Sequence, residues 1–241
     1  MEITIINGSP RKNGATFKIL NYLCETLKKE CPNVSIVFYD LIDCKPKYCI
    51  GCQICYKTGK CIETDDQIEQ IHDQIEQSDG VIFGSPTNGS NVSGLFKVFH
   101  DRVHMADEQL LYRKPCINLT TYELAGGNST LKIMKNMIMI AGGYVSNAIA
   151  IKCLFNQNPL TEKNRKKLDN ITKGFIAKIR KNSPPMWSKI YNKLAINLFF
   201  KPFILKHKEH YKGVIDSWIE KKLLRKKFDK FLVILMFACF P

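Results

Sequence analysis

The hydrophobic residues of this chain form short apolar stretches that alternate with segments of helical periodicity. Five stretches read as buried β-strands: residues 2–6, 34–39, 81–84, 116–120 and 144–151. The segments between and after them carry apolar residues three or four positions apart, as in Phe17, Leu20, Leu23 and Leu27. Strands that alternate with helices predict a parallel sheet covered by helices on both faces, with right-handed crossovers.

Two segments depart from this alternation. Residues 44–63 hold a dense group of cysteines without any period, and Thr64-Asp65-Asp66-Gln67 after them fits a capping box at a helix start. Ser183-Pro184-Pro185 ends the pattern, and the remainder reads as two or three basic helices. We therefore expect an α/β domain over residues 1–182, with a doubly wound five-stranded parallel sheet and a cysteine insert at 44–63. A helical C-terminal extension should cover residues 183–241.

Three predicted loops are rich in Gly, Ser, Thr and Asn: residues 7–16, 85–94 and 121–128. They leave the carboxyl ends of the first, third and fourth strands, which meet at one crevice in a doubly wound sheet. The first loop precedes a helix N-terminus, where backbone N–H groups bind phosphate. It contains neither G-x4-G-K-[ST] nor G-x-G-x-x-G. We expect a cradle for a monophosphate; a plain polar turn is the alternative.

The cysteines carry a second chemical signal. Four of the ten form the pattern C-x2-C-x2-C-x5-C at Cys49, Cys52, Cys55 and Cys61. Four thiolates this close together can wrap one tetrahedral metal or one cubane cluster, and the compact spacing favours a [4Fe–4S] cluster over zinc. Zinc and four free thiols remain alternatives.

Length and composition are those of an ordinary globular protein: 241 residues, 45% hydrophobic and 24% charged. No apolar run reaches the roughly 18–20 residues of a membrane helix, and the N-terminus lacks the layout of a signal peptide, so we expect a cytoplasmic location. The net charge of +14 is concentrated at residues 183–241, with 12 basic and 4 acidic residues. No nucleic-acid-binding signature appears there. We expect amphipathic helices that pack on the domain or on a second subunit and turn a solvated basic face outward, with weak contact to an anionic membrane surface as the alternative.

Three segments carry a resemblance to a known family. The stretch NGSPRKNGAT, the cysteine cluster and GSPTNGSNVSGLFKVFHDR resemble the flavodoxin-like NAD(P)H-dependent FMN reductases, and most closely their iron–sulfur flavoproteins. By element order the resemblance covers residues 1–182. It implies a flavodoxin-like fold, FMN and a [4Fe–4S] cluster as cofactors, and a nicotinamide or ferredoxin-type electron donor. It also implies a homodimer or homotetramer.

The resemblance assigns roles to the loops. The family's first loop binds the FMN phosphate, and the matching residues here are Ser9, Arg11, Asn13 and Thr16. The second loop lies against the isoalloxazine ring; Pro86, Thr87, Asn88 and Gly89 match it, with Asn88 where many relatives carry an aromatic residue. The third loop closes the other edge of the ring at Thr120, Gly126 and Gly127. The motif F-x-D-R, with Asp101 and Arg102, is expected to be structural.

The function these features predict is an FMN-dependent oxidoreductase that passes electrons between NAD(P)H or a reduced carrier, FMN and the cluster. No side chain need act as an acid or base, so no catalytic residue is assigned. Two alternatives stay open. One is a cluster-free NAD(P)H-dependent FMN, quinone or nitro reductase; the other is a non-enzymatic flavin electron carrier.

Overall fold

A five-stranded parallel sheet forms the centre of the molecule. The structure, a computed structural model, describes residues 1–102, 109–155, 157–194, 200–220 and 222. The strand order is β2-β1-β3-β4-β5, the doubly wound flavodoxin-like arrangement. The strands are β1 (Glu2–Asn7), β2 (Ser35–Asp40), β3 (Gly80–Pro86), β4 (Pro115–Tyr122) and β5 (Tyr144–Lys152). The predicted fold class is confirmed, and every predicted strand is found.

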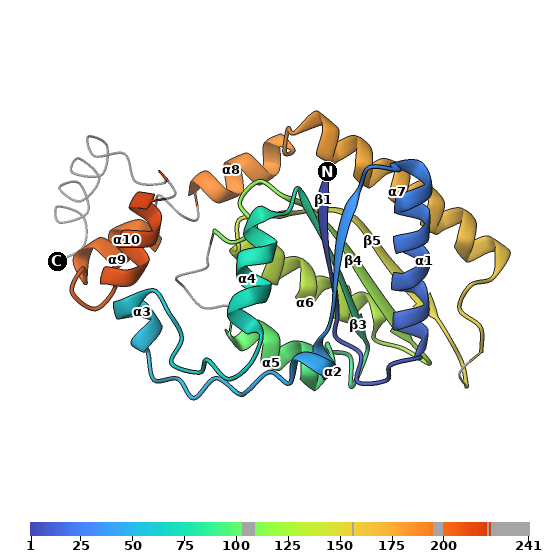
Figure 1. Ribbon diagram of the computed structural model, residues 1–241, viewed down its shortest axis with the longest axis horizontal. Coiled ribbons are helices and arrows are strands. Elements are labelled where there is room, and N and C mark those ends of the chain that lie inside the picture. The colour runs from blue at the N-terminus through green and yellow to red at the C-terminus, as the bar shows by residue number, and fades with distance from the viewer. Residues whose placement is uncertain (103–108, 156, 195–199, 221, 223–241) are drawn as a thin grey trace.

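Helices cover both faces of this sheet (Figure 1). They are α1 (Ala15–Glu30), α4 (Ile68–Gln77), α5 (Gly94–Arg102), α6 (Gly127–Ile140) and α7 (Glu162–Lys181). One apolar core joins α1 and α7 to strand residues such as Ile5, while a second joins α4, α5 and α6 to the opposite face through residues such as Ile6. Neighbouring residues of a strand point to opposite faces, so a strand buried on both sides needs an unbroken apolar run.

The start of α4 differs from the prediction. Gln67 is the N-cap, and its side chain makes no capping hydrogen bond. The Asp66 carboxylate accepts instead from the backbone N–H of Ile68 at 3.2 Å and from the Arg102 guanidinium at 2.8 Å. The predicted capping box over residues 64–67 is therefore wrong, because a distant arginine fixes the chain at this point.

In Figure 1, α3 (Ile54–Thr58) of the cysteine segment lies beside α9 (Lys201–Lys206) and α10 (Lys212–Glu220) of the C-terminal extension, to one side of the sheet. The short helix α2 (Leu41–Cys44) leads into the cysteine segment, and α8 (Met186–Leu194) precedes α9 in the extension. A small apolar core of Ile204, Val214 and Trp218 packs against Tyr56 on α3. The end of the extension thus packs on α3, while Cys49 and Cys52 stay exposed. The sequence predicts that the extension packs on the domain or a second subunit, but not that it meets α3.

The helical spacing of Trp187, Ile190 and Leu194 predicts one apolar stripe on α8. The stripe lies largely at the surface, since these side chains are 45%, 50% and 48% exposed. Within the residues that the structure describes, no helix is both long and apolar enough to cross a membrane. The sequence also predicts a helix face that includes Val103, an apolar stripe that includes Leu223, and an uncharged apolar stretch at 231–240; these three lie outside the described residues.

Candidate functional site

The loops after β1 and β3 are fastened to each other at the carboxyl edge of the sheet. The backbone N–H of Gly8 donates to the Gly84 carbonyl at 2.8 Å, and the Ser93 hydroxyl donates to the Gly8 carbonyl at 2.5 Å. The backbone N–H of Ser93 donates to the Ser85 hydroxyl at 2.9 Å, which fixes Ser93 in place. The first two loops therefore form one rigid rim.

Ser9 folds the first loop rather than projecting from it. The side chain is buried; its Oγ accepts from the N–H of Arg11 at 3.2 Å, and its own N–H donates to Asn7 Oδ1 at 3.1 Å. Arg11 and Asn13 are exposed. The serine shapes the loop that displays these two polar side chains.

A cavity of about 290 Å³ opens where the first loop meets α1. Arg11, Asn13 and Gly14 line it together with Lys18. No side chain caps α1 at Gly14, so the N–H groups of its first turn remain available to an anion. The cavity therefore combines a helix N-terminus with two basic side chains, a combination that suits a phosphate.

The far wall of this cavity comes from the loop after β5, through Gln157 and Pro159. Sequence reasoning missed both residues and also Lys18. The topology could have predicted Gln157 and Pro159, because α1 and α7 pack on the same face of the sheet. The loop entering α7 must then lie beside the loop entering α1.

Thr16 connects α1 to the sheet. Its hydroxyl and that of Thr121 lie 2.8 Å apart in a hydrogen bond, and both side chains are buried. The hydroxyl therefore holds the helix start at the end of β4. A phosphate in the cavity would meet the backbone N–H groups of this first turn.

The second loop is braced against the third by threonine hydroxyls. Thr87 donates its backbone N–H to the Thr121 carbonyl at 2.8 Å, and its hydroxyl lies 2.9 Å from that of Thr120 and 3.0 Å from that of Thr130. Asn88 and Asn91 close a tight turn with two backbone hydrogen bonds of 2.9 and 3.0 Å. The turn carries Gly89 at its tip.

The tip of the second loop touches the third loop at Gly126. A Cβ on Gly126 would lie 2.7 Å from Ser90 Oγ, and its φ of +88° is itself unfavourable for other residues. The structure thus brings the three predicted loops to one edge of the sheet. Pro86, the last residue of β3, and the buried Thr120 on β4 both lie at this edge.

The four predicted cysteine ligands share one neighbourhood. Cys49 and Cys52 are exposed, whereas Cys55 and Cys61 are half-buried. Burial raises the pKa of Cys55 to about 11, and repulsion from the sulfurs of Cys61, Cys52 and Cys49 adds to the shift. Gly51, Gln53 and Gly59 all have positive φ and reverse the chain between these cysteines.

The sulfurs do not form a finished metal site. Among the described residues, no three or more His, Cys, Asp or Glu side chains are arranged to hold a metal ion. The donor set itself fits an iron–sulfur cluster, because such clusters are held by four cysteine thiolates. The segment carries those four cysteines between residues 49 and 61, with the positive-φ residues Gly51, Gln53 and Gly59 between them.

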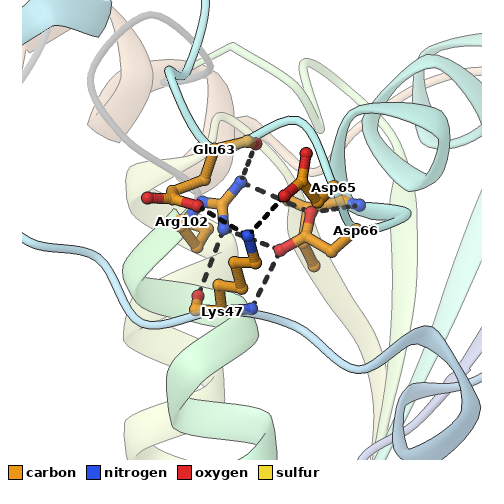
Figure 2. A network of polar contacts seen from close by, with 6 residues as sticks. Lys47, Glu63, Asp65, Asp66 and Arg102 are labelled. Atoms are coloured by element: carbon orange, nitrogen blue, oxygen red, sulfur yellow. Dashed lines mark hydrogen bonds and ion pairs between the residues drawn. The ribbon is translucent and has the colours of Figure 1, made fainter.

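Arg102 closes the base of the cysteine segment (Figure 2). Its guanidinium donates to the Lys47 carbonyl at 3.1 Å and to the Glu63 carbonyl at 2.7 Å, and forms an ion pair with Asp66 at 2.8 Å. The side chains of Arg102 and Asp66 are each 1% exposed. These contacts give Arg102 the structural role that the motif F-x-D-R predicts. The sequence did not predict that the contacts would be made to the ends of the cysteine segment.

The sheet order and the polar rim at its carboxyl edge define a flavodoxin-like protein with a phosphate-suited cavity. The family model described as NADPH-dependent FMN reductase matches residues 1–153, and the chain belongs to this family. The predicted family is thereby confirmed. Membership makes the protein an oxidoreductase of the FMN reductase class.

Relatives agree with this assignment. An iron–sulfur flavoprotein of Clostridioides difficile (strain 630) is 54% identical over 225 residues, which cover 93% of this chain and 100% of that protein. One from Archaeoglobus fulgidus is 31% identical over 163 residues, covering 67% of this chain and 76% of its own. The apo form of an NADH:FMN oxidoreductase has the same fold, with a TM-score of 0.57 and 19% identity over 78% of this chain and 92% of that one.

Proposed function

We propose that the protein passes electrons between NAD(P)H or a reduced ferredoxin-type carrier, a bound FMN, and a [4Fe–4S] cluster held by Cys49, Cys52, Cys55 and Cys61. Bound FMN would supply the exchange between two-electron and one-electron transfer, which no amino-acid side chain provides. The observation that supports the cluster assignment is the spacing C-x2-C-x2-C-x5-C, together with the likeness to a relative named as an iron–sulfur flavoprotein.

For the flavin, the proposal places the phosphate in the cavity beneath Arg11 and Asn13. The first-turn N–H groups of α1 would bind the phosphate oxygens, and Arg11 and Lys18 would balance their charge. Ser9 and Thr16 would hold the loop and the helix in position. The rigid second loop, from Pro86 to Gly89, would support the ring.

The third loop would border the other side of the ring, with Gly126 at its bend and Thr120 at its base. Thr87 contacts Thr120 directly, at 2.9 Å between hydroxyl oxygens, so the two loops would keep a fixed separation. A fixed separation would help to orient a flat ring for hydride transfer. We further propose a homodimer or homotetramer, since α8 leaves Trp187 and Ile190 about half exposed.

One observation favours a second candidate, a cluster-free NAD(P)H-dependent FMN, quinone or nitro reductase. No finished metal site exists among the described residues. Anaerobic purification followed by flavin, iron and sulfide analysis separates the two functions. FMN with iron and sulfide supports the proposal, and FMN without iron supports the cluster-free reductase.

A further inference from the structure

A single guanidinium joins the two ends of the segment that carries all four cysteines. The segment runs from Lys47 to Glu63, and the carbonyls of these two residues accept from different nitrogens of Arg102. Lys47 also donates its backbone N–H to Asp66 at 2.9 Å. The arginine and its partner thus close the segment into a loop of fixed width (Figure 2).

The Arg102 guanidinium is charged and buried, and stabilising the fold does not by itself account for this. Arg102 and Asp66 are almost fully buried, and a buried ion pair is a weak source of stability because desolvation offsets the attraction. The Nε of Arg102 is buried and has no hydrogen-bond partner among the described residues. The two carbonyls that its guanidinium binds belong to Lys47 and Glu63, which lie two residues from Cys49 and from Cys61 along the chain. A permanently charged group therefore stands at the base of the segment that carries the four cysteines.

We propose that Arg102 is a positioning residue for the cysteine segment and that its buried positive charge raises the reduction potential of the cluster held there. The inference rests on the proposed function. Reduction adds one electron to the cluster, and a nearby cation stabilises the added negative charge. The effect is larger in a low-dielectric interior than in water. Hydrogen bonds and charge around the sulfurs are established determinants of cluster potential.

Two substitutions of opposite charge test this electrostatic role. Arg102→Met removes a buried positive charge, and Asp66→Asn removes the neighbouring negative one. We expect opposite shifts in a redox titration monitored by electron paramagnetic resonance. At the wild-type midpoint potential, the ratio of reduced to oxidised cluster should fall about tenfold in R102M, a shift of about 59 mV for one electron. In D66N the ratio should rise.

An exposed ion pair on the same helix provides the matched control. Lys97 and Asp101 are paired on α5, with side chains 52% and 41% exposed. Lys97→Met makes the same change of charge as R102M, but solvent screens it. The potential of K97M should equal that of the wild type.

Arg102→Lys separates charge from geometry. Lysine keeps the positive charge but cannot span two carbonyls and a carboxylate as the planar guanidinium does. We expect R102K to keep the wild-type potential while losing iron faster to a chelator. If R102M does not fold, the potential of D66N still tests the electrostatic role, and iron loss from R102K still tests the positioning role.

The outcomes are distinguishable. Equal potentials in all variants, or shifts of the same sign in R102M and D66N, would overturn the role of Arg102 while leaving the cluster in place. Wild-type protein without iron and sulfide would overturn the proposed function itself, and the inference with it.

Discussion

Replacing Gly213 with alanine should detach the C-terminal extension from the cysteine segment. An ideal Cβ at position 213 would lie 2.0 Å from the backbone N of Gly59 and 2.6 Å from the carbonyl carbon of Thr58. These are backbone atoms at the end of α3, which cannot turn aside as a side chain can. Since non-bonded carbon contacts lie at about 3.5–4.0 Å, α10 must move outward by about 1.5 Å.

The expected loss of stability follows from the apolar contacts that the movement of α10 would disturb. Ile204, Val214 and Trp218 are each at most 1% exposed in the small core between the extension and α3. Overpacking of this kind costs about 1–3 kcal/mol. Complete detachment would expose all three side chains, each worth about 1.5–3 kcal/mol when fully buried. Because Gly→Ala inside a helix normally stabilises by about 0.5–1 kcal/mol, the predicted destabilisation has the opposite sign.

Gly174→Ala is the matched control. Gly174 is also helical, in α7, and its Cβ would meet only Asn147, at an ordinary 3.7 Å. Urea unfolding should show G174A slightly more stable than the wild type and G213A less stable. Protease cleavage within residues 201–220 and iron loss should both increase in G213A. If G213A were as stable as G174A and equally resistant to protease, the contact between α10 and α3 would be absent in solution.

Other changes are expected to act more locally. Arg11→Ala should weaken FMN binding by about 1–3 kcal/mol, measured by titration of apoprotein, whereas Lys12→Ala should not, because Lys12 lies outside the cavity and pairs with Asp43. Truncation after residue 228 should preserve FMN and iron; truncation after residue 182 should preserve FMN but lose iron, since it removes α10. Burial lowers the pKa of His100, so the folded state resists protonation and stability should decline as the pH falls below about 6.5. His100→Gln should flatten that decline in urea unfolding between pH 7.5 and 5; an unchanged slope would show that His100 is not its source.

The strands could be predicted because a parallel sheet buried on both faces requires unbroken apolar runs. Ile3 and Ile5 fill one core and Ile6 the other, within one such run. The polar loops were predictable for the same reason, since the topology fixes where the strands end. That argument places a loop at the edge but does not say which of its side chains project from it.

The roles within the site depended on contacts between distant parts of the chain. The place of Thr16 is set by its hydrogen bond to Thr121, 105 residues away. The capping box failed because Asp66 pairs with Arg102, 36 residues away. The approach of Gly213 to Gly59 leaves no periodic signal in either segment. Such pairs are selected by packing, which a single sequence does not display.

The composition of the anaerobically purified full chain tests the central claim most directly. Its ultraviolet–visible spectrum should be combined with measurement of flavin, iron, sulfide and zinc. The account predicts one FMN with about four irons and four sulfides per chain. It also predicts the loss of iron, with FMN retained, in Cys55→Ala. Stoichiometric zinc, or FMN with no iron at all, would contradict it.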